Sequence, residues 1–303
     1  MEMFFLNNSY NVIAEYTDST SLSPLGAVEG EQSKTCRFCG KDDRDVTFNQ
    51  RAHAISESLG NKNIISHYEC DDCNAHFGKF LENDLGKSIN PLRAAMKVKG
   101  KKGAIQHSQG VKIHSNDNEI SFSTSDLNRF DYNQETGTFI INPKTQKYIP
   151  VAAYKALIKM AITIAPCSAI DDLKWAIDWV NEKEHTCAFD KLELFVQEIY
   201  TPYNHVYVSI YKRKNDINLP DYMFVIVFEN LLLRIFIPAN KKTYNIQPLY
   251  KLHYFPANYS GEMRISEIRN MAGVTQISSE PIIAGTVGSG ANLTVSILKS
   301  FAD

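Results

Sequence analysis

Four cysteines stand in two pairs of identical spacing, Cys36-Arg-Phe-Cys39 and Cys70-Asp-Asp-Cys73. Two residues between cysteines let both thiolates point at one ion, and two such pairs complete a tetrahedral zinc site. Because four protein ligands leave no position for water, such a site is structural. We therefore expect one Zn²⁺ whose binding replaces a hydrophobic core too small to fold alone. Four independent buried cysteines, or a redox dithiol, fit this regular spacing less well.

About thirty residues separate the two pairs, more than common zinc modules have, so this segment carries something besides metal ligands. It includes His53 at the start of the run HAISESLGNKN. From the second pair onward the chain reads CDDCNAHFGKFLENDL. The combination resembles the zinc-stapled HNH endonucleases, and the likeness covers residues 33–103, roughly a quarter of the chain.

The resemblance implies a ββα-metal fold, in which a two-stranded hairpin and a helix hold one divalent cation against a scissile phosphate. It makes His53 the general base, since a neutral imidazole can take the proton of the attacking water. It makes Asn74 a ligand of the catalytic cation, Mg²⁺ or Mn²⁺, because both prefer hard oxygen donors. The middle asparagine of the family, which orients the histidine or its loop, is Asn63 or Asn61.

The position directly before the histidine departs from the family pattern. Many HNH sequences have an acidic metal ligand there, whereas this chain has Ala52, which cannot bind a cation. A carboxylate for the catalytic cation must then come from elsewhere, and we expect Glu57 to supply it. Glu82 and Asp84 are the other nearby candidates. Without such a ligand the module would bind nucleic acid and not cut it.

Positive charge is concentrated just after the second cysteine pair. The formal net charge of the chain is −2, yet residues 85–115 contain seven lysines and arginines and no acidic residue. Beside a phosphate-cutting module, this charge favours the approach of DNA. We expect DNA contacts from four side chains of a glycine-rich loop or arm, namely Lys97, Lys99, Lys101 and Lys102.

The chain of 303 residues exceeds the usual size of a single core, which predicts two domains. Residues 1–32 have the pattern of a strand and a linker, and residues 33–103 form the zinc-stapled module with its basic arm. Residues 104–303 are expected to form an α+β domain with a mostly antiparallel sheet and two main helices. The predicted fold class is therefore α+β.

Hydrophobic periodicity predicts the elements of the larger domain. Segments rich in β-branched and aromatic residues predict strands over 111–115, 119–125 and 136–143. Apolar residues at helical spacing predict a helix over 151–165 that ends at Pro166, and a second helix over 169–184. Further strands are predicted over 205–214, 221–230, 231–238 and 250–256, with a hairpin turn at Glu229 and Asn230.

Composition excludes several classes of protein. Apolar residues make up 44% and charged residues 22%, as in ordinary globular proteins, and the longest apolar runs are too short for a membrane span. Six cysteines are too few for a disulfide scaffold in a chain of this length. The N-terminus has no basic flank and does not resemble a secretory signal. We therefore expect a cytoplasmic protein.

The function that the resemblance implies is metal-dependent hydrolysis of DNA phosphodiester bonds, with double-stranded DNA as substrate and a family-level link to bacterial restriction or anti-phage defence. The alternative is a non-catalytic, zinc-dependent nucleic-acid-binding module. A zinc deaminase is excluded because Glu57 lies four residues after His53, not two. Cutting two strands with one site per chain favours a two-fold homodimer, and the C-terminal domain could bind an activating ligand or partner.

Overall fold

The computed structural model describes residues 9–19, 34–90, 93, 98–100, 103–104, 107–108, 111–115, 119–124, 130–133, 138–141, 148–185, 192–214, 219–239, 264–270, 286–287 and 293–298. The chain forms two compact units, Met1–Leu85 with Ile149–Val274, and Gly86–Tyr148 with Thr275–Asp303. These limits differ from the boundaries expected after residues 32 and 103, because the first unit joins the cysteine segment to later helices and strands. In the described parts, no helix has the length and apolar character that crossing a membrane requires.

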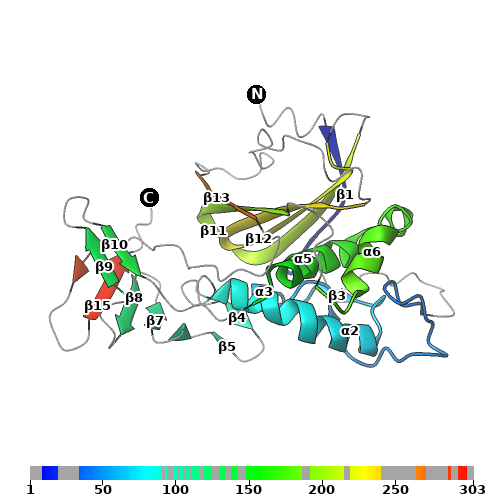
Figure 1. The fold of residues 1–303 in the computed structure, drawn as a ribbon, viewed down its shortest axis with the longest axis horizontal. Helices are drawn as coiled ribbons and strands as arrows, with labels where there is room; N and C mark the ends of the chain where they lie inside the picture. The colour runs from blue at the N-terminus through cyan, green and yellow to red at the C-terminus, as the bar shows by residue number, and fades with distance from the viewer. Residues whose placement is uncertain are drawn as a thin grey trace. The chain divides into compact units, whose positions relative to one another are not determined.

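A four-stranded antiparallel sheet is the largest element of the first unit (Figure 1). Its long central strand is β11 (Glu193–Arg213). Strand β12 (Tyr222–Ile237) pairs with one edge of β11. The other edge pairs with β13 (Arg264–Asn270) along its first part and with β1 (Tyr10–Thr17) along its last part. The antiparallel sheet and the α+β class predicted from the sequence are thus confirmed.

Strand β12 passes through Glu229 and Asn230 without a turn, so the predicted hairpin there is wrong. Glu229 has a positive φ of 50°, and it pairs with Tyr203 between two register shifts of β11. Residues of β11 pair with β12 on both sides of this irregularity, so the strands predicted over 221–230 and 231–238 form one continuous strand. The strand predicted over 205–214 is the last part of β11, whereas residues 250–256 lie outside the described residues.

Helix α5 (Pro150–Ile164) is buried along all 15 of its residues. Pro150 suits the first helical position, where no N–H partner is needed. The helix packs against β11, β12 and the turn η2 described below, and the Tyr154 hydroxyl donates to the Phe236 carbonyl at 2.9 Å (Figure 1). The helix predicted over 151–165 is confirmed. The second helix, α6 (Lys174–Asn181), begins later than predicted because the 3₁₀ turn η4 (Cys167–Ala169) precedes it.

The cysteine segment folds as a short hairpin followed by a helix, which is the ββα order that the resemblance implied. Strand β2 (Ala52–His53) pairs with β3 (Ile65–Ser66), and the 3₁₀ turn η1 (Glu57–Leu59) lies in the connection. Gly60 ends this turn with a φ of 91°, a conformation that favours glycine. Helix α2 (Asp71–Phe77) continues through the π-helical turn η2 (Gly78–Glu82) into α3 (Asn83–Ser88).

The second unit contains a five-stranded antiparallel sheet in the order β14, β15, β8, β7, β6. Its strands are β6 (His107–Ser108), β7 (Val111–Ser115), β8 (Glu119–Thr124), β14 (Thr286–Val287) and β15 (Leu293–Leu298). Two hairpins join β9 (Phe130–Asn133) to β10 (Thr138–Ile141) and β4 (Lys99–Gly100) to β5 (Gly103–Ala104). The strands predicted over 111–115, 119–125 and 136–143 are therefore confirmed as β7, β8 and β10.

Candidate metal centre and active site

The four paired cysteines converge on one point. The Sγ atoms of Cys36, Cys39, Cys70 and Cys73 all lie within 4.8 Å of one another. The Sγ atoms of Cys39 and Cys70 are 3.8 Å apart, close to the roughly 3.8 Å that a tetrahedral site with zinc–sulfur bonds of about 2.3 Å requires. The donor set therefore fits the structural Zn²⁺ predicted from the spacing.

Ionisation of these thiols also points to a cation between them. A hydrogen bond from Cys73 lowers the pKa of Cys36 to about 4, so one thiolate forms readily. The same hydrogen bond raises the pKa of Cys73, and burial raises the pKa of Cys70 to about 11. One thiolate thus forms at the expense of its neighbours. A divalent cation would resolve this conflict, since it stabilises every coordinating thiolate at once.

Backbone hydrogen bonds give the two C-x-x-C pairs their shape. The Gly40 amide donates to the Cys36 carbonyl at 2.8 Å, and Gly40 has a φ of 72°, which closes the first turn. The Arg37 amide donates to the Tyr68 carbonyl at 2.8 Å, which joins the first pair to the segment before the second. The second pair begins at the N-terminus of α2, where the Asn74 amide donates to the Cys70 carbonyl at 2.9 Å.

The side chain of Asp71 fixes the loop that leads into β2. Its carboxylate accepts hydrogen bonds from the Thr47 hydroxyl at 2.6 Å and from the amides of Asn49 at 3.1 Å and Gln50 at 2.8 Å. The hydrogen bond from Thr47 lowers the pKa of Asp71, so the carboxylate stays charged. One turn further along α2, Asn74 Nδ2 donates to Gln50 Oε1 at 3.2 Å. The helix that begins at the second cysteine pair therefore holds the strand that carries His53.

His53 lies at the end of β2 with 21% of its side chain exposed. Burial lowers the pKa of His53, and the nearby Glu57 opposes this effect only in part. The imidazole is consequently neutral at pH 7. Its Nε2 lies 3.6 Å from Glu57 Oε1, close enough for the carboxylate to act on the ring electrostatically but too far for a strong hydrogen bond.

Of the two candidate asparagines, Asn61 is the one whose side chain lies beside the His53 ring. Its side-chain amide donates to the carbonyls of Ile55 at 2.6 Å and Ile64 at 3.0 Å, and its oxygen accepts from the Ile64 amide at 2.9 Å. The same Nδ2 lies 3.5 Å from His53 Nδ1. Because an amide has only two N–H donors and both are used, Asn61 orients the loop without capturing the Nδ1 lone pair. Asn63 is exposed, and its Nδ2 donates to the Asp18 carbonyl at 2.9 Å.

The hairpin, the helix and the four-cysteine site together have the architecture expected for this class of nuclease. Residues 36–90 match the HNH endonuclease family model. The match coincides with the segment singled out by its motifs, and it implies a nucleic-acid substrate for these residues, which we call the HNH module. No curated protein and no solved structure matches the chain.

The acidic residues of the HNH module lie in different surroundings. Glu57, with 35% of its side chain exposed, is the carboxylate beside His53. Glu82, at the end of η2, also raises the pKa of His53, with a smaller effect than Glu57. Asp84 accepts a hydrogen bond from the Ile149 amide at 3.2 Å, at the start of α5. Among the described residues, the four cysteines form the single group of three or more His, Cys, Asp or Glu side chains that could share an ion.

A buried lysine outside the HNH module reaches into it. Lys159 of α5 is 0% exposed, and its Nζ lies 3.1 Å from the His53 carbonyl oxygen and 3.2 Å from Glu82 Oε1. The carboxylate of Glu69 is also buried, with Oε2 at 2.9 Å from Nζ. Burial alone would lower the pKa of Lys159, but Glu69 and Glu82 raise it. Burial raises the pKa of Glu69 to about 7, an effect that the Lys159 ammonium group opposes.

Lys159 and Glu69 were not among the site residues predicted from the sequence. The signal was nevertheless present, because Lys155 and Lys159 interrupt an otherwise apolar helix at a spacing of four residues. A buried lysine requires an acidic partner or another acceptor. What the sequence does not give is the identity of that partner.

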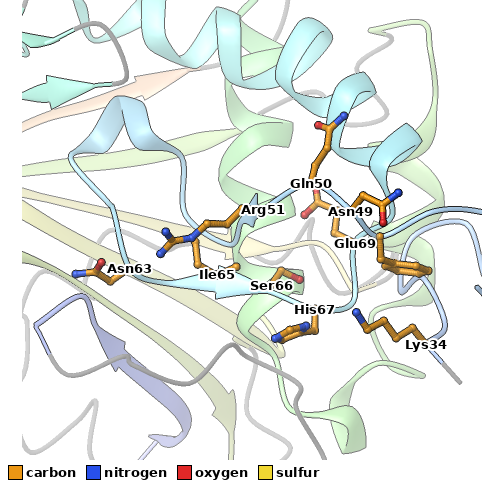
Figure 2. A pocket seen from close by; sticks show the side chains of 10 residues that line it. Lys34, Asn49, Gln50, Arg51, Asn63, Ile65, Ser66, His67 and Glu69 are labelled. Carbon is orange, nitrogen blue, oxygen red and sulfur yellow. The ribbon is translucent and has the colours of Figure 1, made fainter. Parts of the chain in front are cut away.

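A cavity of about 400 Å³ lies beside the hairpin of the HNH module (Figure 2). The residues that line it are Lys34, Phe48, Asn49, Gln50, Arg51, Asn63, Ile65, Ser66, His67 and Glu69. Half of them are cationic or carry a side-chain amide, namely Lys34, Arg51, Asn49, Gln50 and Asn63. Arg51 directly precedes β2, two residues before His53, and it lowers the pKa of His53. Ile65 of the lining is the β-sheet partner of His53. The cavity therefore lies along the hairpin that carries the candidate general base, although His53 is not one of its lining residues.

The basic arm predicted to contact DNA lies mostly outside the described residues, since Lys97, Lys101 and Lys102 belong to the undescribed positions. Lys99 is part of β4, but its side chain is not described. DNA contacts from these four lysines remain a prediction. Among the described residues, Arg51 and Lys159 are the cations that act on His53, and Lys34 and Arg51 line the cavity.

Proposed function

We propose that the HNH module hydrolyses phosphodiester bonds of DNA with His53 as the general base. The observation that carries this proposal is the neutral, partly buried imidazole of His53 at the end of β2, between Glu57 and Asn61 and inside the matched family segment. A neutral imidazole with a lowered pKa is free to accept a proton at the working pH.

The chemical step assigned to the chain is proton removal from water. The His53 imidazole takes a proton from a water molecule as its oxygen attacks phosphorus, and the bond from phosphorus to the 3′ oxygen breaks. The leaving oxygen then takes a proton from solvent, and the imidazolium returns its own proton to water. Glu57, 3.6 Å from Nε2, stabilises the imidazolium that forms.

A catalytic cation, Mg²⁺ or Mn²⁺, would supply charge neutralisation at the scissile phosphate. Asn74 and Glu57 are the residues that we propose would hold it. Asn74 uses its Nδ2 on Gln50, which leaves the amide oxygen as a hard donor, and the Glu57 carboxylate is partly exposed. So small a protein ligand set is compatible with Mg²⁺, which usually keeps several waters and substrate oxygens as ligands.

The cavity beside the hairpin supports a nucleic-acid strand as substrate. Lys34 and Arg51 supply positive charge, and the amides of Asn49, Gln50 and Asn63 supply donors and acceptors. Because Arg51 directly precedes β2 and acts electrostatically on His53, a phosphate bound by Arg51 would belong to a nucleotide close to the scissile bond. We propose that Lys34 and Arg51 bind the DNA backbone, together with the basic arm at Lys97, Lys99, Lys101 and Lys102.

The test is nicking of supercoiled plasmid in Mg²⁺ and in Mn²⁺ by the wild type and by His53→Ala at equal zinc content. His205→Ala is the matched control, since His205 lies on β11 with 52% of its side chain exposed. The proposal expects His53→Ala to lose nicking by several hundredfold or more, because general base catalysis alone contributes on the order of 10² to 10⁴. Equal nicking by wild type and His53→Ala would refute the role of His53.

One observation favours a second candidate function, a zinc-dependent module that binds nucleic acid without cutting it. Ala52, where the family has an acidic ligand, is 1% exposed and cannot hold a cation. Salt-sensitive DNA binding by a wild-type protein that nicks in neither metal would favour this alternative.

Three wider proposals follow from the nuclease assignment. A cytoplasmic location would keep the four thiols reduced for zinc, and two chains would pair to cut both strands. The family resemblance suggests restriction or anti-phage defence, with a ligand or partner acting through the later part of the chain. Plating efficiency of phage on cells expressing wild type or His53→Ala tests the biological role.

A further inference from the structure

Helix α5 belongs to the same compact unit as residues 36–85 of the HNH module, although it follows the matched segment by about sixty residues. All 15 residues of the helix are buried, so its two lysines have no direct access to solvent. Lys159 and Lys155 are both 0% exposed and lie one turn apart. Their surroundings differ, and the difference indicates what Lys159 does.

Three segments of the HNH module meet at the ammonium group of Lys159. The nearest oxygens are those of Glu69 at 2.9 Å, the His53 carbonyl at 3.1 Å and Glu82 at 3.2 Å. The ammonium group donates hydrogen bonds to the His53 carbonyl and to Glu82, and it forms an ion pair with the buried Glu69 carboxylate. Glu69 directly precedes the zinc ligand Cys70, and Glu82 ends the π-helical turn η2. Lys159 therefore links the backbone of β2 to the zinc centre and to the helix.

The hairpin that carries His53 is short. Strands β2 and β3 are two residues long, and beyond them the Ala54 amide donates to the Ile64 carbonyl at 3.0 Å. A longer strand would fix the backbone by its own ladder, whereas here a buried cation contacts the carbonyl oxygen of His53 itself. Small displacements of a catalytic group reduce rates strongly, on the order of a hundredfold per ångström.

We propose that Lys159 is a positioning residue of the nuclease site, which holds the backbone of His53 in place from a helix outside the HNH module. This inference rests on the proposed function, because it assigns Lys159 a task in the same reaction. It implies that residues 36–90 do not form a complete active site and that α5 supplies the missing support. The competing explanation is that Lys159 only stabilises the fold.

Lys155 provides a matched control on the same helix. Its Nζ lies 3.4 Å from the Glu184 carbonyl, 3.5 Å from Glu182 Oε2 and 5.1 Å from the Trp179 ring centroid. These partners belong to α6 and the residues after it, and Lys155 also acts electrostatically on His76 of α2, but it is not among the charges that act on His53. Lys155→Met thus removes an equally buried cation from α5 without touching the support of His53.

The experiment compares the full-length wild type with Lys159→Met, Lys155→Met and the double variant Lys159→Met with Glu69→Gln. The double variant keeps buried charge balanced if Lys159→Met alone does not fold. Zinc content and thermal unfolding are measured first, and then kcat and KM for plasmid nicking. In ¹⁵N-histidine-labelled protein, the His53 ring signals report its surroundings independently of cleavage.

The expected result is a folded, zinc-loaded Lys159 variant whose kcat is roughly tenfold to a hundredfold below that of Lys155→Met, with KM changed less than about twofold. Its His53 signals should shift, and those of Lys155→Met should not. A normal kcat with unchanged His53 signals overturns the proposal, and so does loss of the fold in both Lys159 variants, which would make the residue purely structural. If the wild type does not nick DNA, the nuclease assignment fails, and the His53 signals alone decide whether Lys159 positions this residue.

Discussion

The Arg37 guanidinium donates a hydrogen bond to the Ile162 carbonyl oxygen at 2.7 Å, from the middle of the first cysteine pair to the C-terminus of α5. The same Nη1 lies 2.9 Å from the carbonyls of Thr163 and Ala165. The last carbonyls of a helix have no partner within the helix, and a cation there also interacts favourably with the helix dipole. Tyr68 covers the guanidinium, with its ring centroid 4.5 Å away.

Arg37→Met should therefore destabilise the first unit by about 3 kcal/mol, since hydrogen bonds to a charged group are each worth about 1.5–3 kcal/mol and leave carbonyls unpaired when removed. Arg44→Met is the control, because Arg44 pairs with Asp42 at the surface with 84% of its side chain exposed, and it should change stability by less than about 0.5 kcal/mol. Urea unfolding measures both values. Equal effects would show that Arg37 does not stabilise α5.

Cys70→Ser should abolish stoichiometric zinc binding, because the closed four-cysteine site loses one ligand. Cys167→Ser should keep one zinc per chain, since Cys167 is exposed and lies outside the cluster. Removal of zinc by a chelator should speed amide hydrogen exchange in residues 34–90 far more than in residues 222–237 of β12. Unchanged exchange in residues 34–90 after verified zinc loss would argue against a structural metal.

Asn61→Ala should lower both stability and nicking, because it removes three hydrogen bonds from a side chain that is 1% exposed. We expect about 3 kcal/mol of destabilisation, from about 1 kcal/mol per buried hydrogen bond. Asn63→Ala removes one exposed hydrogen bond to Asp18 and should cost less than about 1 kcal/mol. A larger loss of nicking in Asn63→Ala would assign the orienting role of the family asparagine to Asn63.

The lowered pKa of His53 predicts that nicking persists into mildly acidic solution. Burial lowers this pKa from 6.5, so the imidazole stays neutral at a pH where an exposed histidine is protonated, and the acidic limb of kcat/KM should lie below pH 6.5. Stability also falls with pH, because the unfolded chain binds the proton first and His53 therefore destabilises the fold as pH falls below 6.5. His53→Gln should reduce this acid sensitivity in unfolding measurements. An acidic limb above pH 6.5 would contradict the assignment.

The cavity beside the hairpin predicts how strongly DNA binding depends on salt concentration. Lys34→Ala and Arg51→Ala should each weaken DNA binding and reduce the slope of log K against log salt by about 1, as expected for one lost phosphate contact. Lys174→Ala should leave the slope unchanged, since Lys174 lies on α6 with 77% of its side chain exposed. Fluorescence anisotropy over a salt series measures the slopes. A cavity that does not touch DNA would give three equal slopes.

Local sequence spacing determined much of the HNH module. The two C-x-x-C pairs converge as predicted, and the hairpin-then-helix order agrees with the family that residues 36–90 match. The predicted helix over 151–165 is also confirmed, since Pro150 and Pro166 fix where its backbone hydrogen bonding can begin and end. These features depend on interactions between residues that are close in sequence or that would share one ion. The residue types and their spacing are therefore enough to predict them.

Pairing between distant segments decided what the sequence did not. The unbroken course of β12 through Glu229 depends on β11, whose length could not be inferred from the residues of β12. Likewise, β15 joins the sheet of the second unit beside β8, although about 170 residues separate them. A β-ladder is made by backbone groups that every residue carries, so the identity of the partner strand is not written locally.

The same distinction holds at the candidate active site. The sequence determined His53 as the candidate general base and the four cysteines as candidate zinc ligands. Only the tertiary structure selected Asn61 over Asn63 as the neighbour of the imidazole, and only it brought Lys159 to the His53 carbonyl across 106 residues of chain. The physical reason is that a buried ammonium group needs oxygens from wherever the fold supplies them, and a backbone carbonyl leaves no trace in the sequence.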